Sequence, residues 1–302
     1  MLLKIIFILF FNVILFSKEP ITPIPLEIDF DKEKANLGKE LFFDPILSKD
    51  NTISCHSCHI LEQGGDDNLQ FSFGVDGKVG NMNSPTVFNS TFNFVQFWDG
   101  RAKNLQEQVQ GPITNEVEMA HTFEEIIKIL NNTEYKEKFR KIYKDGVTKN
   151  NITDSLAQFQ KTLITPNSPF DKYLRGDKNA ISKEQKQGYE LFKNQGCIAC
   201  HHGVNVGGNL YAKFGLISEL QSDSKGRYEV TKNELDKYYF KVPTLRNIEL
   251  TSPYLHDGRI EELEDVVKFM AHYQLGKSLS EEEAKKIVLF LKSLTGDLKY
   301  YE

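Results

Sequence analysis

The chain of 302 residues has little of three residue types: four cysteines, four methionines and one tryptophan. So few cysteines exclude a fold held together by a dense disulfide framework. After the first residues there is also no apolar run long enough to span a bilayer. The formal net charge of −5 argues against nucleic acid as a partner. The 40% hydrophobic content can fill a sizeable core, and the length predicts two domains.

The one long apolar run is at the N-terminus, MLLKIIFILFFNVILFS. A single lysine precedes about a dozen apolar residues, and Ser17 provides a small residue for cleavage. This pattern predicts a signal peptide over residues 1–17 and a periplasmic mature protein, with an uncleaved membrane anchor as the alternative. Removing Lys4 leaves 36 of the 37 basic residues against 42 acidic ones, a net charge of −6. Such an acidic surface is compatible with a basic protein partner.

The four cysteines occur in two short segments of the same spacing, ISCHSCHI (53–60) and GCIACHH (196–202). The spacing C-x-x-C-H matches Cys55, Cys58 and His59 with Cys197, Cys200 and His201. Disulfides within such pairs would constrain the chain little. A redox dithiol does not explain two copies, and the 142-residue separation is unlike a zinc finger. Two covalent haem c groups explain every feature, with thiols that attach each haem and a histidine that ligates its iron.

A longer repeat accompanies the cysteine segments. PTVFNSTFNFVQFWDGR (85–101) aligns without a gap on PTLRNIELTSPYLHDGR (243–259), an offset of 158 residues. A G-x-E-L-F segment also precedes each C-x-x-C-H, at 38–42 and 188–192. The repeat predicts two homologous haem domains, residues 18–165 and 166–302, joined near the Pro-rich TPNSPFDKYLRGD. Apolar residues four apart predict a helix from Arg101 and another from Arg259.

These two helices differ at one informative position. Met270 lies eleven residues after Arg259, and the offset places Pro112 there in the first half. A thioether is a soft ligand that raises the haem potential. We therefore predict an electron-transferring His201/Met270 haem and a first haem with His59 plus another ligand or none. Packing of Met270 in the core is the alternative, and the rival His272 should point to a different face of the helix.

On these segments, and on LGKELFFDPILSKDNTISCHSCH and QGPITNEVEMA, the chain resembles the bacterial dihaem cytochrome c peroxidases over nearly its whole mature length. The resemblance implies a mostly α fold of two cytochrome-c-like domains. It implies reduction of hydrogen peroxide to water at the first haem, a small donor cytochrome c or similar redox protein, and a homodimer. It also implies a calcium ion at the domain boundary, with Asn83, Thr251 and Pro253 at the matching positions.

The resemblance also implies three residues for the chemistry. Gln108 and Glu118 match the distal pocket of the first haem, and Trp98 matches a tryptophan between the haems that helps electrons pass. Cleavage of the O–O bond requires a proton to move between the two oxygens, which Glu118 can carry while Gln108 orients the peroxide. Without the resemblance, Glu118 would be interpreted as a loop acid, Gln108 as part of a polar helix face and Trp98 as a packing aromatic. His256, the counterpart of Trp98, is expected to bond a haem propionate or an interface group.

One family ligand is missing. Much of the family has a histidine in the glycine-rich loop after the first haem segment, where SFGVDGKVGNMNSPT has Val75. We therefore expect an open first haem at rest; the alternative is that the loop rearranges and offers Met82 or another ligand. Two alternatives to a peroxidase stay open. One is a relative that oxidises a protein or organic substrate, in which tyrosine replaces the methionine at position 270; the other is an electron carrier or redox sensor.

The remaining segments indicate helices. TFEE (122–125), SKEQ (182–185) and SEEE (280–283) are predicted capping boxes, and Gly296 is the predicted end of the last helix. Short hairpins are expected around 70–80 and 208–240. His56, His121 and His202 are expected at the surface or around the ligands.

Overall fold

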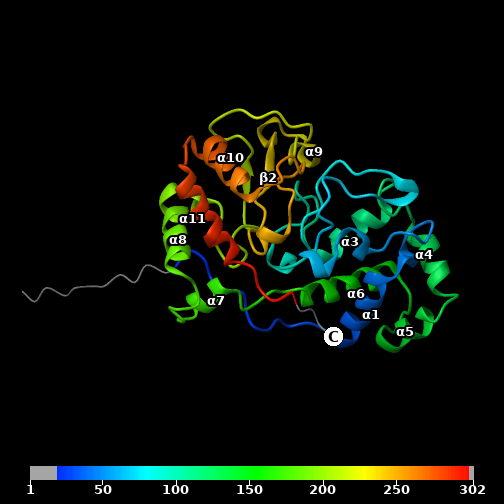
Figure 1. The fold of residues 1–302 in the computed structure, drawn as a ribbon. Coiled ribbons are helices and arrows are strands. Elements are labelled where there is room, and N and C mark those ends of the chain that lie inside the picture. Colours follow the sequence, from blue (N-terminus) through cyan, green and yellow to red (C-terminus); the bar gives the residue numbers. More distant parts are fainter. Residues whose placement is uncertain (1–18, 299–302) are drawn as a thin grey trace, which may run out of the picture.

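The computed structural model describes residues 19–298, so the predicted signal peptide lies outside the described residues. The described chain is mostly α-helical, which confirms the predicted fold class (Figure 1). The helices are α1 (Lys32–Phe43), α2 (Cys55–Cys58), α3 (Leu105–Thr114), α4 (Phe123–Leu130), α5 (Tyr135–Ile142), α6 (Lys149–Thr162), α7 (Pro169–Leu174), α8 (Lys183–Gln195), α9 (Tyr228–Thr231), α10 (Leu263–Leu275) and α11 (Glu281–Lys292). Among the described residues, none of these helices is long and apolar enough to cross a membrane.

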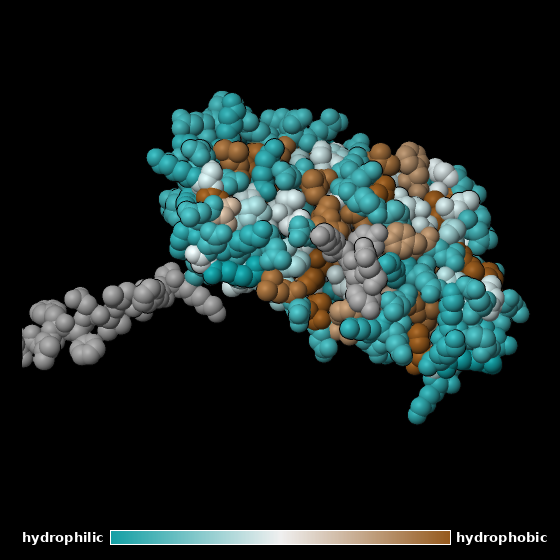
Figure 2. Space-filling view, turned by 60° about the horizontal axis from the view of Figure 1, so that its bottom comes forward, coloured by the Kyte–Doolittle hydropathy of each residue, from teal (hydrophilic) through white to brown (hydrophobic). Residues whose placement is uncertain are grey.

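The core consists of two hydrophobic clusters, one in each half of the chain. The first gathers residues of α1 and α3–α6, and the second gathers residues of α7, α8, α10 and α11 (Figure 1). Each end of the described chain packs on the opposite half, because Ile21 belongs to the second cluster and Leu298 packs against the first. Figure 2 shows a mostly hydrophilic surface on which hydrophobic residues are exposed in patches.

The glycines of the two G-x-E-L-F segments explain the closest helix pairs. A β carbon on Gly38 in α1 would lie 1.9 Å from the carbonyl oxygen of Ser155 in α6. A β carbon on Gly188 in α8 would lie 1.9 Å from the carbonyl oxygen of Lys286 in α11. Only glycine lets the two backbones approach this closely. The repeated segment therefore builds the same helix contact in each half.

The predicted helix starts at Arg101 and Arg259 were wrong by one turn. The helices begin at Leu105 and Leu263, which keeps the offset of 158 residues. The backbone N–H of Arg101 donates to Asp99 Oδ1 (3.1 Å), so the chain turns before the helix. Asn104 then caps α3, because its side chain accepts the N–H of Glu107 (2.9 Å).

Two of the three predicted capping boxes are present, at Ser182 and Ser280. Thr122 accepts the N–H of Glu125, but its own N–H donates to His121 Nδ1 (2.9 Å), so the reciprocal bond is missing. The predicted helix end at Gly296 was wrong, because α11 ends at Lys292. Gly296 instead packs on the backbone of the other half, where its β carbon would meet the oxygen of Thr165 at 2.2 Å.

Both expected hairpin regions contain paired backbone. Strands β1 (Tyr211–Lys213) and β2 (Tyr239–Lys241) pair antiparallel with Ala212 opposite Phe240. Phe73 and Val79 form an isolated antiparallel bridge. The long connection between β1 and β2 carries α9, so this pair is not a tight hairpin.

Two asparagines of the repeat meet at one threonine between the halves. Asn89 and Asn247 are 158 residues apart and have nearly equal φ angles of 60° and 61°. The side chain of Asn89 accepts the N–H of Thr165 (2.9 Å) and donates to its hydroxyl (2.8 Å). Asn247 Nδ2 donates to the same hydroxyl (3.1 Å). The pseudosymmetry of the sequence is thus visible in the packing around Thr165.

Candidate functional site

Four of the predicted site residues of the second half line one cavity of about 340 Å³. Cys197 and Cys200 follow Gly196, whose φ of 104° ends α8 and turns the chain into the cavity. His201 comes next, and Met270 reaches the same cavity from α10. The rival His272 is exposed and its ring lies edge-on against Tyr273, so the structure separates it from this cavity as expected.

The electrostatics of this cavity keep its ligands neutral. Burial lowers the pKa of His201 to about 4 and raises the pKa of Cys197 to about 11. His201 Nδ1 donates to the carbonyl oxygen of Val206 (3.2 Å). This bond places the ring proton on Nδ1 and leaves Nε2 with a lone pair. A neutral imidazole of this tautomer can bind a metal ion without losing a proton.

The rest of the cavity fits a flat apolar cofactor. Its apolar lining comes from α8, α10, α11 and the loop after β2, and includes Phe192, Leu245, Ile248, Tyr254, Val266 and Leu291. A ligand pocket of about 300–1,000 Å³ with few polar groups is the usual form of a cofactor site. The cysteines, histidine and methionine at its walls are the donor set of a c-type haem with His/Met ligation.

The first half repeats the arrangement of attachment and axial residues. Cys55 and Cys58 bound the short helix α2, and His59 follows at its end. Burial raises the pKa of Cys55 to about 12 and lowers the pKa of His59. His59 Nδ1 donates to the carbonyl oxygen of Gly65 (3.2 Å). His59 is therefore prepared as a metal ligand in the same way as His201.

The position that holds methionine in the second half is apolar and donor-free in the first. Pro112 lies inside α3, and the equal offset of the two helices places it where α10 carries Met270. The carbonyl of Pro112 accepts the N–H of Met119 (3.1 Å), which folds the following loop back onto the helix. The side chain of proline offers no ligand to an iron ion.

Glu118 lies in this returning loop and is half-buried. Burial raises the pKa of Glu118, and two neighbours oppose the shift: Asn115 Nδ2 donates to Oε1 (2.5 Å) and Arg101 acts through its charge. The same carboxylate acts electrostatically on the Cys58 thiol, so Glu118 and the first haem segment are neighbours. Gln108 is half-buried on α3, four residues before the matching proline.

The loop with Val75 is fixed to the loop with Glu118. The N–H of Val75 donates to the carbonyl oxygen of Glu118 (2.8 Å), and its side chain is buried. A β carbon on Gly74 would lie 2.1 Å from the oxygen of Val117, so the two backbones are in contact. Met82 is half-buried farther along this loop. Valine, where the resemblance leads one to expect a histidine, therefore lies in a loop that is fixed to the loop with Glu118.

Trp98 and His256 connect the halves at the edge of the cavity. Both line it, with ring centroids 6.2 Å apart. Trp98 Nε1 donates to the carbonyl oxygen of Asn83 (2.9 Å). His256 Nε2 bonds Ser222 Oγ (2.7 Å), and its ring stacks on Phe240. Trp98 thus belongs to the first half of the sequence but reaches the cofactor cavity of the second.

The three residues predicted for calcium also line this cavity. Asn83 Nδ2 donates to the oxygen of Leu69 (3.0 Å), which leaves Oδ1 as an acceptor. Asn68 Nδ2 donates to two carbonyls next to Thr251 and Pro253 and so fixes that turn. The described residues contain no group of three or more His, Cys, Asp or Glu side chains that could hold a metal. A cation here would rest on amide and carbonyl oxygens, which suits calcium.

Sequence reasoning missed two charged residues of the cavity. Lys241 is only 5% exposed, and burial lowers its pKa to about 8. Asp66 is 1% exposed, its Oδ1 has no hydrogen-bond partner, and burial raises its pKa to about 8. A charge within the apolar YYFKVP was the available signal for Lys241. A cavity with an ammonium group suits a cofactor with carboxylate substituents.

The other histidines lie outside this cavity. His56 Nε2 pairs with Glu62 (3.0 Å) near the surface. His202 Nδ1 contacts Asn209 Nδ2 (2.7 Å). His121 is buried, and its Nδ1 accepts the backbone N–H of Thr122 (2.9 Å).

Comparisons with known proteins agree with this geometry. The family described as di-haem cytochrome c peroxidase matches residues 32–179. The chain is 50% identical to cytochrome c551 peroxidase of Nitrosomonas europaea, over 93% of this chain and 85% of that protein. It is 49% identical to cytochrome c peroxidase Ccp of Escherichia coli, over 92% of this chain and 61% of that protein. A crystal structure of a MauG-like protein associated with microbial copper homeostasis shares the fold, with a TM-score of 0.79 and 24% identity over 95% of this chain and 96% of that one.

Proposed function

Because this chain belongs to the di-haem cytochrome c peroxidase family, we propose that it reduces hydrogen peroxide to water with electrons from a small donor cytochrome. One observation supports different roles for the two haems. Two equivalent C-x-x-C-H sites differ at the facing helix, which has Met270 in the second half and Pro112 in the first. A ligated iron can store and pass electrons, whereas an iron without a sixth ligand can meet a substrate.

The proposal assigns the following residues. The covalent haem attachments are Cys55, Cys58, Cys197 and Cys200, and the axial ligands are His59 for the first haem and His201 with Met270 for the second. The two domains are residues 18–165 and 166–302. Trp98 is the route between them, since it spans from the first half into the second cavity.

Glu118 and Gln108 would act on the peroxide. Reduction of one peroxide to two waters consumes two electrons and two protons. The bound haems would supply the electrons. Glu118 would take the proton from one oxygen and return it to the other, because burial raises the pKa of its carboxyl group and so makes the protonated, donating form easier to reach. Gln108 would donate a hydrogen bond that orients the substrate.

Further parts of the proposal rest on the family and on the same cavity. A calcium ion would bind Asn83 Oδ1 and oxygens of Thr251 and Pro253, and so brace the junction of the halves. The resemblance to the family also leads us to propose a homodimer. The leader-like residues 1–17 support export to the periplasm, where an acidic surface would meet a basic donor.

Steady-state turnover tests the proposal directly. Haem-loaded protein with a pre-reduced small cytochrome c should oxidise that donor when peroxide is added, in a ratio of two donors per peroxide. Protein that holds both haems but gives no peroxide-dependent oxidation would be an electron carrier or sensor. Oxidation of an organic or protein substrate in place of the cytochrome would indicate the third class.

A further inference from the structure

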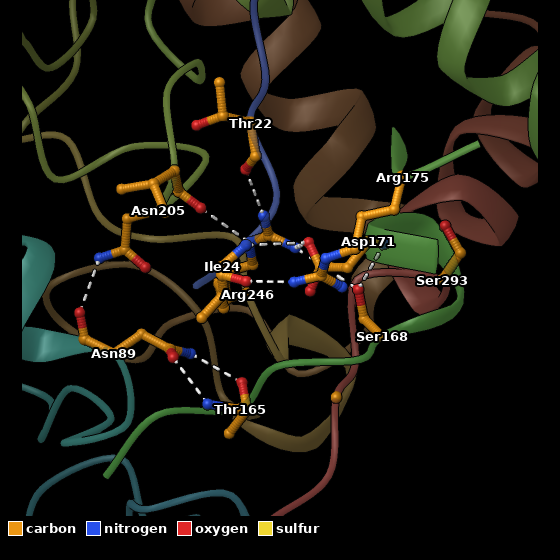
Figure 3. A network of polar contacts seen from close by, with 12 residues as sticks. Thr22, Ile24, Asn89, Thr165, Ser168, Asp171, Arg175, Asn205, Arg246 and Ser293 are labelled. Carbon is orange, nitrogen blue, oxygen red and sulfur yellow. Dashed lines mark hydrogen bonds and ion pairs between the residues drawn. The ribbon is translucent and has the colours of Figure 1, made fainter. Parts of the chain in front are cut away.

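Arg246 is among the largest fully buried side chains of the described chain, with 1% of its surface exposed. Figure 3 shows it within a network of polar contacts. Its guanidinium group joins three segments that are far apart in sequence. Nε donates to the oxygen of Val204 (3.0 Å), Nη1 to Asp171 Oδ1 (2.8 Å) and Nη2 to the oxygen of Thr22 (3.0 Å). A buried ion pair often adds no stability over a hydrophobic pair of similar size. The position of these bonds therefore points to another role.

One of the three segments is the N-terminal strap, residues 19–24. Ile21 anchors it in the second hydrophobic cluster and is 1% exposed. The carbonyl of Pro20 accepts the N–H of Gly203 (2.8 Å), so the strap lies directly on the turn after the second C-x-x-C-H. In Figure 3 the strap passes Thr22 and brings its backbone carbonyl to the guanidinium group.

The turn under the strap contains a residue whose backbone conformation is unfavourable for its type of side chain. Val206 has a φ of 48°, in the left-handed region that β-branched residues avoid. Its carbonyl is nevertheless the acceptor of His201 Nδ1 (3.2 Å). A conformation of this kind persists only where the surroundings hold it. Arg246 contacts the same turn, because it binds the carbonyl of Val204 two residues earlier.

In the first half, the carbonyl that accepts the N–H of the histidine ring needs no such support. The acceptor of His59 Nδ1 is Gly65, whose φ of 84° costs a glycine little. The repeat counterpart of Arg246 is Phe88, which is fully buried in the first hydrophobic cluster. The arginine is thus present in the half where the acceptor is a strained valine, and absent where it is a glycine.

We propose that Arg246, held by the N-terminal strap and Asp171, is a positioning residue that keeps the Val206 carbonyl on Nδ1 of His201. The inference rests on the proposed function, in which His201 is an axial ligand of the second haem. A hydrogen bond from the distant ring nitrogen makes a histidine ligand more basic. A more basic ligand favours oxidised iron, so loosening the clamp should raise the midpoint potential of the second haem.

Three variants of the full chain test this. Arg246→Lys keeps a cation beside Asp171 but cannot reach three segments, and Ile21→Ala loosens the strap without changing a charge. Each should shift the reduction equilibrium of the second haem about tenfold, which is about 59 mV for one electron, and leave the first haem unchanged. Adding Val206→Gly to Arg246→Lys should restore the potential, because glycine needs no clamp. Thr22→Ala is the control, since only the backbone of Thr22 is bound.

The outcomes separate this inference from the function. If Arg246→Lys lowers the melting temperature but leaves the second potential at the wild-type value, Arg246 is merely structural and the proposal is overturned. Failure of Val206→Gly to restore the potential overturns it too. Absence of a low-spin His/Met haem in the electron paramagnetic resonance spectrum of the wild type would defeat the proposed function together with this inference.

Discussion

At the scale of single residues, the protonation of Glu118 is set by three opposing influences. Burial raises its pKa, whereas the bond from Asn115 and the charge of Arg101 favour the ionised form. A general base must be ionised to accept a proton, so its pKa determines the lower pH limit of activity.

The pH profile of peroxide reduction should therefore have an acidic limb above the pH at which a free glutamate titrates. Arg101→Gln removes a cation, raises the pKa further and should move the limb to higher pH. Glu118→Gln should abolish the limb and slow peroxide reduction about 10²–10⁴-fold. Arg259→Gln, the equivalent change in the second half, is the control and should leave the limb in place. A wild-type rate in Glu118→Gln would remove this residue from the mechanism.

Val75 carries a second prediction at this scale. The oxidised protein should show one high-spin haem beside one low-spin haem in electron paramagnetic resonance, because valine offers no ligand. Val75→His should convert the first haem to low spin and introduce a reductive activation step before peroxide reacts. Val75→Leu is the matched control and should resemble the wild type. Two low-spin haems in the wild type would mean that another residue, such as Met82, ligates the first iron.

At the scale of elements, the helix pairs depend on two glycines, although helix propensity favours alanine over glycine at such positions. Alanine in an exposed helix interior is more favourable than glycine by about 0.8–1.0 kcal/mol. In α1 and α8 glycine should instead be more favourable than alanine, because a β carbon would lie 1.9 Å from the backbone of the facing helix.

Gly38→Ala and Gly188→Ala should each destabilise the haem-loaded protein by about 1–3 kcal/mol or more, as overpacking does. Chemical denaturation followed by circular dichroism measures the change. Asn36→Ala, at an exposed position of α1, is the control and should be neutral or slightly stabilising. Equal stability of the Gly38 variant and the control would mean that the helices can separate without cost.

The difference between α10 and α3 gives a further prediction for an element. Met270→Leu keeps the volume of the side chain but removes the thioether, so the potential of the second haem should fall. Spectroelectrochemical titration measures both haems in one sample. Met82→Leu should leave the second potential unchanged. An unchanged potential in Met270→Leu would show that this methionine only packs in the core.

At the scale of the whole molecule, the two halves share the same framework and differ in the residue that faces each haem segment, Met270 or Pro112. Asn89 and Asn247 meet at Thr165, and Gly38 and Gly188 build equivalent helix contacts. Exchanged chain ends bind each half to the other, since Ile21 packs on the second core and Leu298 on the first.

This architecture predicts the cofactor content. The mature protein should carry two covalent haems and no free thiol, because the two attachment segments use all four cysteines. A pyridine haemochrome assay gives the ratio of haem to protein. Thiol titration under denaturing conditions gives the number of free thiols per chain. One haem per chain, or a disulfide detected by mass spectrometry, would contradict the dihaem assignment.

The sequence by itself predicts the attachment and axial residues of the proposal, because haem attachment uses a short fixed spacing that needs no distant contact. It also predicted the α fold and the contrast of Met270 with Pro112, since a gapless repeat carries positions from one half to the other. The start of α3 was misplaced because the Asn104 cap fixes it at Leu105, whereas the apolar pattern gives the period of a helix and not its first residue.

The tertiary structure alone decided how the sites are completed. Lys241 and Asp66 become parts of the cavity only through burial, which the sequence pattern does not show. The hydrogen bonds of Arg246 join it to Thr22 and Asp171, whose separation along the chain exceeds any local period. Contacts of this kind form only once the two cores have packed, and this is why no stretch of the sequence predicted them.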